Sequence, residues 1–265
     1  MKKTISLILA LILAVALLAG CGKPANTNTP DSGNNQGGSG SGKNSDSSGT
    51  AKAQIKGEIA VGNTVTFGKY EQDNDTSNGA EPIEWIVLDV DNGKAFLISK
   101  YVLDGVAYGA ADTDADDYFI PVTWETSLMR AWLNGEFLNA AFTASEQAAI
   151  ITSHVLTFDN KEYGTSGGND TDDKLYILGI SDCEKFFPKN EDRKCIPTDY
   201  ALARGIYTTD EQKDGKATCG WFLRTPGAGP VVAIYVDRDG SIDYAGGFVT
   251  WKDVGARPVM WVNVG

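Results

Sequence analysis

The sequence predicts an α+β domain in which two helices separate an N-terminal and a C-terminal β-rich region. Three observations support this fold class. Segments with β-rich alternation lie before residue 104 and after residue 220, apolar residues follow helical spacing between them, and strands and helices do not alternate as a parallel sheet requires. Residues 55–265 are assigned to this domain, since their length suffices for one domain with its own core.

The N-terminal β region begins with an expected strand at 61–70, VGNTVTFGKY. Two further strands are expected at 82–90 and 94–103, on either side of Asp91-Asn92-Gly93. Because Asn-Gly tolerates the positive φ values of a tight turn, these two strands are predicted to form a hairpin.

Helical segments follow. A helix is predicted over 123–142 with Thr123 as its N-cap, because apolar residues recur there at helical spacing: Leu128, Met129, Trp132, Leu133 and Phe137. A second helix is predicted from Thr143, with Glu146 three residues later completing a capping box.

The second half of the chain is expected to be richer in loops. A strand-like segment at 151–158 precedes a polar loop at 159–174. Next come an expected strand at 175–180, a helix opened by a Ser181/Glu184 capping box and a short helix at 198–205. The closing β region is expected to contain four segments: 220–227, 231–236, 241–246 and 254–262.

The N-terminal residues have the pattern of a lipoprotein signal peptide. A basic start and the apolar run 5–19 lead to Leu18-Ala19-Gly20-Cys21, which looks like a lipobox. We expect residues 1–20 to be removed and the Cys21 thiol to carry a diacylglycerol, which anchors the protein to the extracellular face of the cell membrane. An ordinary secretory signal or a short membrane anchor is the alternative. Residues 21–54 then read as the lipidated Cys and a disordered Gly/Ser/Asn linker.

The charge of the chain limits its partners. The net charge is −12, and removal of Lys2 and Lys3 with the signal takes it to −14. So acidic a chain is a poor nucleic-acid binder, and it is repelled by an anionic membrane, so the lipid and not the domain is expected to hold the membrane. The expected partner is an unknown protein or glycan ligand.

No catalytic group, metal site or cofactor is expected. The cysteines Cys183, Cys195 and Cys219 match no zinc spacing, and His154 is the single histidine. A disulfide between Cys183 and Cys195 stays open. The segment 237–243, DRDGSID, lacks the glutamate of a calcium loop, and a hairpin turn explains it without an ion.

Seven motifs occur in order along the chain: TVTFGKY, EPIEWIVLDVDNGKAFLISKY, TWETSLMRAWLNGEFLNAAF, LYILGISD, YALARG, WFLRTPG and GARPVMWV. Together they resemble an uncharacterised domain family of gut Firmicutes lipoproteins, over most of residues 58–263. That family is similar to the C-type-lectin-like superfamily, which also holds the formylglycine-generating enzymes. The resemblance implies a mixed fold with paired terminal strands, two main helices and a loop-rich C-terminal β region.

The C-terminal segment also resembles the variable region of diversity-generating retroelement target proteins. The frame of that region is present, from Arg224, Pro226 and Gly227 to Arg257 and Pro258. Positions that tend to be Asn in that family hold other residues here. Mutagenesis of adenines in Asn codons cannot produce Glu, Gln or Met, and 228–254 contains none of them. Trp251 and Lys252 depart from the pattern.

This resemblance implies a ligand-binding surface within residues 228–252. An exposed Phe and Trp beside an Arg are typical of binding surfaces. We therefore expect ligand-binding residues at Val231, Val232, Arg238, Ala245, Phe248, Thr250 and Trp251. Two alternatives stay open, a fixed-specificity glycan-binding module and an enzyme of the sulfatase-modifying type, which would depend on Cys219. The remaining tryptophans, Arg224 and Arg257 are expected to be structural.

Overall fold

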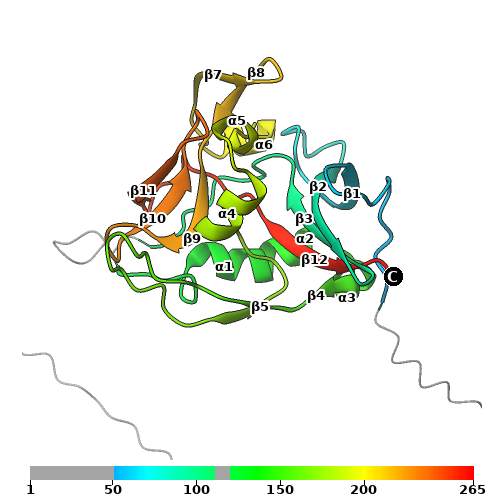
Figure 1. Ribbon diagram of the computed structural model, residues 1–265. Coiled ribbons are helices and arrows are strands. Elements are labelled where there is room, and N and C mark those ends of the chain that lie inside the picture. Colours follow the sequence, from blue (N-terminus) through cyan, green and yellow to red (C-terminus); the bar gives the residue numbers. More distant parts are fainter. Residues whose placement is uncertain (1–50, 111–119) are drawn as a thin grey trace, which may run out of the picture. The chain divides into compact units, whose positions relative to one another are not determined.

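Antiparallel strands make up most of the regular secondary structure in the computed structural model, which describes residues 51–110 and 120–265 (Figure 1). The predicted signal peptide, Cys21 and the linker up to residue 50 lie outside the described residues. The fold class is the expected mixed α+β arrangement, built on a curled five-stranded antiparallel sheet with few helices. Among the described residues, no helix is long and apolar enough to span a membrane.

The larger sheet has the strand order β1-β2-β3-β12-β4. Its strands are β1 Thr64–Tyr70, β2 Glu81–Asp91, β3 Lys94–Ser99, β12 Val259–Asn263 and β4 Ile150–Ile151. The predicted hairpin is confirmed: Asn92 and Gly93 join β2 to β3 with φ values of 45° and 73°. The long motif 81–101 thus forms the centre of the sheet.

The first and last strands share this sheet but do not pair with each other. β12 lies between β3 and β4, whereas β1 pairs only with β2. The expectation of paired terminal strands is therefore wrong in detail. The two ends of the domain still meet, because the Ala53 amide donates to the Asn263 carbonyl oxygen at 2.7 Å and the Asn263 side chain donates to the Ala51 carbonyl oxygen at 2.9 Å.

The predicted long helix starts later than expected. α1 Leu128–Trp132, the π-helical turn η1 Leu133–Phe137 and α2 Leu138–Ala141 follow one another without a break. Thr123 is not the N-cap, because residues 123–126 form a turn, and Ser127 accepts the Arg130 amide instead. α3 Ala144–Ala149 begins with the predicted Thr143/Glu146 capping box.

The other helices are short. They are α4 Ile180–Phe186, α5 Asn190–Arg193 and α6 Asp199–Ala203. Ser181 does not cap α4, since that helix follows Gly179, whose amide donates to the Asp182 carboxylate at 3.3 Å. α6 begins after Thr198, as expected. The picture of two main helices is replaced by one helical run at 128–141 and several pieces of at most seven residues.

A smaller sheet of order β11-β10-β9 forms the C-terminal β region, with β9 Trp221–Pro226, β10 Val232–Val236 and β11 Ile242–Phe248. Two hairpins complete the fold. β5 Ser153–Val155 pairs with β6 Thr171–Asp173, and β7 Thr208–Lys213 pairs with β8 Lys216–Cys219. β6 lies in the segment expected to be a loop, and β7–β8 was not predicted at all.

The strand expected at 175–180 is absent. The segment forms one isolated bridge, between Tyr176 and Val259, before it enters α4. Its apolar side chains are buried, but its carbonyl groups find other partners, because the Arg224 guanidinium donates to the Ile177 carbonyl oxygen at 2.8 Å. Burial without a ladder explains why the apolar run looks like a strand in the sequence.

Aromatic side chains fill the core, as expected. Trp85, Trp124 and Trp221 are fully buried, and their indole N–H groups all have oxygen acceptors. Arg257 is also buried, with its guanidinium over the rings of Phe187 and Trp221. The predicted structural roles of these tryptophans and of Arg257 are confirmed.

Candidate ligand-binding surface

Three aromatic rings form a cluster on the smaller sheet, and two of them face the solvent. The Trp251 ring meets Tyr235 and Phe248 edge-on, and both centroid separations are 5.9 Å. Phe248 is 40% exposed and Trp251 is 37% exposed, whereas Tyr235 beneath them is buried. We call Tyr235, Phe248 and Trp251 the aromatic surface. Two of the residues expected to bind ligand are thus in contact and accessible.

The backbone fixes the position of Trp251. Phe248 ends β11, and a turn brings the Trp251 amide to within 3.0 Å of the Phe248 carbonyl oxygen. The indole then lies on Gly247, where an added Cβ would approach the ring to 2.4 Å. The glycine therefore makes room for the ring. This accounts for the combination of glycine and aromatic residues at 246–251, which the sequence alone left open.

The structure brings some of the other expected site residues together and separates others. Val232 lies opposite Phe248 in the β10–β11 pair, and the Val231 carbonyl oxygen accepts the Val249 amide at 3.1 Å. Thr250 is half-buried in the turn before Trp251. The Ala245 carbonyl oxygen instead accepts the Ala228 amide at 2.7 Å. Ala245 is therefore held toward the loop that follows β9.

Arg238 lies in the β10–β11 turn rather than beside Phe248 and Trp251. Its guanidinium stacks over Tyr207 at 4.7 Å and pairs with Asp237 at 2.9 Å and with Asp253 at 3.8 Å. Its Nε atom is buried with no hydrogen-bond partner among the described residues. The guanidinium is thus held within the domain by Tyr207, Asp237 and Asp253, so Arg238 is less available to a ligand than the sequence suggested.

The acidic turn segment at 237–243 does not gather its carboxylates around a cation site. Asp239 accepts from the Ser241 amide and hydroxyl at 2.8 and 2.6 Å. Asp243 accepts the amides of Ala245 and Gly246, both at 3.0 Å. These carboxylates stabilise the turn and the register shift that follows it in the β10–β11 pair, in line with the interpretation as a hairpin.

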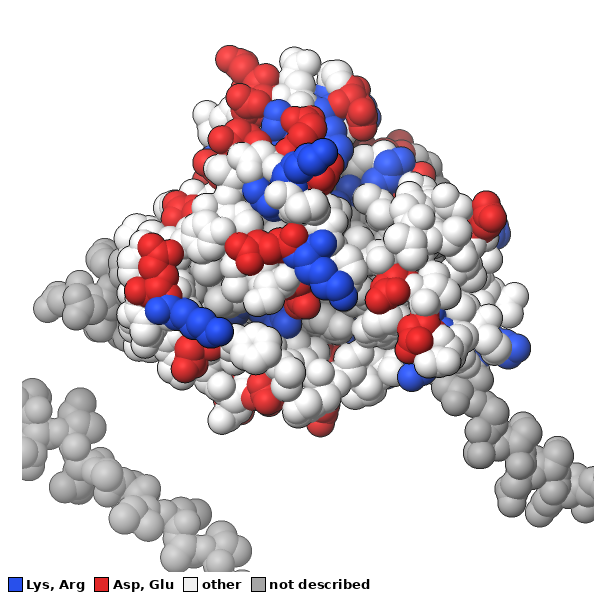
Figure 2. All heavy atoms as spheres, in the orientation of Figure 1, with Lys and Arg blue, Asp and Glu red and all other residues white. Residues whose placement is uncertain are grey.

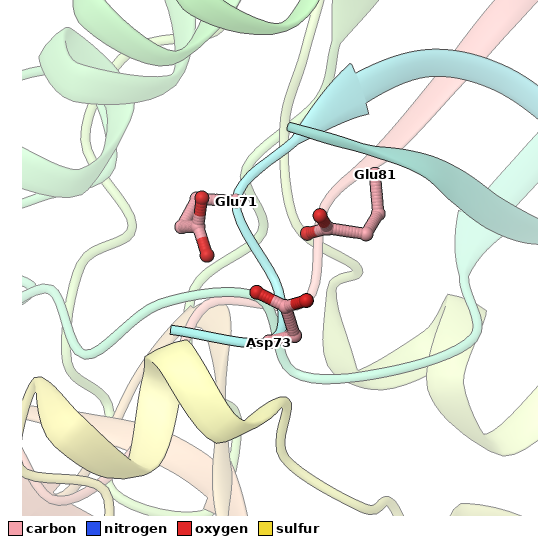
Figure 3. A group of neighbouring side chains, drawn as sticks. All are labelled: Glu71, Asp73 and Glu81. Atoms are coloured by element: carbon pink, nitrogen blue, oxygen red, sulfur yellow. The ribbon is translucent and has the colours of Figure 1, made fainter. Parts of the chain in front are cut away.

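Another carboxylate group, which the sequence analysis did not single out, offers the one arrangement in the described residues that could hold a metal ion. Glu71, Asp73 and Glu81 place carboxylate oxygens within 4.8 Å of one another (Figure 3). Loop donors already occupy two of the three: the Gln72 amide donates to Glu81 at 2.8 Å, and the Asn78 side chain donates to Asp73 at 2.8 Å.

Glu71 differs from its two neighbours because its Oε1 atom is buried without a donor. Desolvation, the nearby Glu81 charge and the contact with Asp73 raise the pKa of Glu71, while the Asn78 hydrogen bond lowers the pKa of Asp73. Hydrogen bonds of the loop thus account for Asp73 and Glu81, whereas the Glu71 carboxylate is destabilised by desolvation and by its acidic neighbours.

In the described part of the chain, neither Cys219 nor His154 has the full set of partners that a catalytic nucleophile or base needs. Cys183, Cys195 and Cys219 are all free and buried, so the Cys183–Cys195 disulfide left open by the sequence is not formed. Burial raises the pKa of the Cys219 thiol well above its ordinary value, which disfavours the thiolate. His154 is exposed, and its partners are Asp172 at 3.0 Å and Asp170 at 3.7 Å.

Together, the fold and the surface define a β-rich α+β domain that carries a solvent-facing aromatic cluster on its C-terminal sheet. A family model described as "Domain of unknown function (DUF6273)" matches residues 92–264, and the chain belongs to this family. No curated protein and no solved structure matches the chain. The match spans β12 and the whole smaller sheet, which includes the aromatic surface.

Proposed function

We propose that this protein is a lipid-anchored receptor of the cell surface that binds a ligand through β10, β11 and the turn to Trp251. Its domain would be a variant of the C-type-lectin-like fold. The observation that carries the proposal is the aromatic surface itself. Exposing apolar rings to water is unfavourable, and exposed rings that pack on one another are typical of binding sites.

The point at which the chain enters the domain supports this proposal. Ala51, where the described domain begins, is hydrogen-bonded to Asn263 near the C-terminus. Figure 1 shows the C-terminus beside the larger sheet, with β10 and β11 on the other side of the domain. The chain therefore enters the domain on the side away from β10 and β11, where the aromatic surface lies.

The diversified form of this receptor is part of the proposal. In it, outward-facing positions of 228–252 vary while the strands keep their register. Val231, Val232, Phe248 and Trp251 are the members of this set that the geometry favours, since each is at least partly exposed at the outer end of the smaller sheet. A rigid sheet that presents variable side chains is how loop-bearing scaffolds accommodate sequence change.

A fixed-specificity glycan-binding module is the second candidate, and the packing of Trp251 on Gly247 favours it. Any side chain at position 247 collides with the indole, so these two positions cannot vary independently. An aromatic ring held in one place suits one conserved ligand. Neither candidate assigns a catalytic role, and the buried thiol of Cys219 supports that choice.

The first test is to sequence codons 220–265 across a population of the source bacterium, together with the DNA immediately downstream. Substitutions confined to adenine positions beside a near-copy repeat would support the diversified receptor. An invariant segment without a repeat would leave the fixed module, which glycan arrays would then test. Loss of array binding in the Phe248→Ala, Trp251→Ala double variant would assign it to the aromatic surface.

A further inference from the structure

Three adjoining hollows lie along α4, away from the aromatic surface. The first, of about 420 Å³, lies between Phe158 and Tyr244. The second is small, about 20 Å³, and the third, of about 260 Å³, extends to His154 and Trp261. The first and second share Ile180 as a wall, and Phe158 lines all three. We call these three adjoining hollows together the α4 groove.

Tyr235 and Tyr244 lie on opposite faces of the β10–β11 pair. Tyr235, which belongs to the aromatic surface, lies opposite Asp243 in the β10–β11 pair. Successive side chains of a strand point to opposite faces, so Tyr244 points away from Tyr235 and into the first hollow. Its hydroxyl donates to Glu184 of α4 at 2.9 Å, which closes this end of the groove.

Two flat apolar walls are open to solvent. Phe158 is 54% exposed and Tyr244 is 41% exposed. Neither has an aromatic neighbour in the described part of the chain, unlike the exposed rings of the aromatic surface. Rings exposed without mutual packing remain available for a ligand to stack on.

The walls are held rigidly from behind. Asn160, next to the first hollow, is buried and donates to the Pro226 carbonyl oxygen at 2.9 Å and to the Tyr244 carbonyl oxygen at 3.2 Å. Arg224, which lines the second and third hollows, is buried and donates to the carbonyl oxygens of Leu156 and Ile177 and to Asp182. The groove is thus a preformed feature of three segments that lie far apart in sequence.

The rim of the groove carries both donors and acceptors. Acceptors are contributed by Glu184 and Asp182, and donors by Lys161, Ser181 and Lys185. α4 faces the viewer in Figure 1, and Figure 2 shows acidic and basic side chains interspersed with uncharged surface on that face. A ligand matched to this rim needs many groups that both donate and accept, which describes sugar hydroxyls.

We propose that the α4 groove binds a linear glycan chain. Its sugar rings stack their C–H faces on Phe158 and Tyr244, and their hydroxyl groups bond to the mixed rim. The first hollow alone exceeds the lower limit for small-ligand sites, about 300 Å³, and a row of adjoining hollows suits a chain of sugars better than a single sugar. This site is separate from the aromatic surface and does not depend on it.

The test measures binding of neutral gluco-oligosaccharides and N-acetylglucosamine oligosaccharides, one to four units long, by isothermal titration calorimetry. Affinity in at least one series is expected to rise at least tenfold from the monosaccharide to the trisaccharide. Phe158→Ala is expected to lower trisaccharide affinity at least tenfold. Tyr163→Ala is the matched control, because Tyr163 is a 45% exposed ring in the same loop that lines none of the three hollows.

The Phe248→Ala, Trp251→Ala double variant separates this proposal from the receptor proposal. It is expected to bind the trisaccharide as the wild type does. Loss of saccharide binding in that variant with retention in Phe158→Ala would overturn the groove and assign the glycan to the aromatic surface. Equal affinity for mono- and trisaccharides would show that the groove does not bind a glycan chain. The proposal would also be overturned if no saccharide binds, or if only uncharged tetrapeptides, measured in parallel, bind.

Discussion

Removing the two exposed rings of the aromatic surface should abolish ligand binding and leave the domain folded. The Phe248 and Trp251 side chains, which the Phe248→Ala, Trp251→Ala variant truncates, are each about three-fifths buried in the wild type. Full burial of such a side chain is worth about 1.5–3 kcal/mol, so each truncation should cost about 1–2 kcal/mol. The sum of about 2–4 kcal/mol stays below the 5–15 kcal/mol stability typical of a domain, so the variant should remain folded.

Urea denaturation followed by far-ultraviolet circular dichroism measures this cost. Trp221→Ala is the core reference, with an expected cost of about 3–5 kcal/mol for one residue, because Trp221 is fully buried. Leu202→Ala is the surface reference, since Leu202 is 41% exposed on α6. In binding, each ring of a central hot spot is expected to contribute at least about 2 kcal/mol, or roughly 30-fold in Kd.

An unfolded double variant, or a single cost at Trp251 as large as that at Trp221, would refute this reasoning. Either result would make the rings part of the core and remove the basis for a binding surface. A folded variant with undiminished ligand binding would refute the function while leaving the structural argument in place. The stability and binding measurements therefore test two separate steps.

Three further predictions follow from local geometry. Gly247→Ala should displace the Trp251 indole and change its fluorescence, and in a double-mutant cycle its cost should largely vanish in the Trp251→Ala background; strict additivity would contradict the contact. The Cys195 and Cys219 thiols should react with a thiol reagent only as fast as the protein unfolds, because both are buried, and rapid labelling of native protein would contradict this. Glu71→Gln should raise the thermal midpoint at pH 7 but not near pH 4. Because the pKa of Glu71 is raised, the folded state loses stability as pH rises from about 4.5 through that pKa. A difference that does not depend on pH would contradict this reasoning, and a calcium-induced rise confined to the wild type would show that the three carboxylates hold an ion.

Local turn chemistry explains which hairpins the sequence could predict. Asn92-Gly93 lies between two strongly apolar segments, so the β2–β3 hairpin was evident. Asp214-Gly215 forms the same kind of turn, with φ values of 52° and 73°, yet β7 and β8 flank it with mostly polar residues. The Asp-Gly signal was present and was missed because the flanking hydrophobic pattern was weak.

Helix starts depend on contacts that a sequence pattern does not contain. Thr123 and Ser127 both precede the apolar run, and only the fold decides between them. The Leu128 amide donates to the Tyr108 carbonyl oxygen at 2.9 Å, which places the chain before α1 and leaves Ser127 as the cap. The helix itself was predictable because Met129, Leu133 and Phe137 bury one face.

The two candidate sites differ in how visible they are from the sequence. Phe248 and Trp251 are three residues apart, so an aromatic surface could be inferred from one short segment. Phe158 and Tyr244 are 86 positions apart, and Asn160, which bonds to both the end of β9 and the middle of β11, is what brings their segments together. A groove built by such a long-range hydrogen bond leaves no local pattern to read.

The same packing limits how a variable surface could work on this fold. Gly227, Gly240 and Gly246 cannot take a side chain, because an added Cβ would meet backbone atoms at 2.3, 1.9 and 2.5 Å. Asp243 is held by two amides of the bulge. Variation within 228–252 is thus excluded at Gly240 and Gly246 and constrained at Asp243. Tyr244 is also constrained, because Asn160 and Glu184 hold it through its carbonyl oxygen and its hydroxyl, so variation there would remove a wall of the α4 groove.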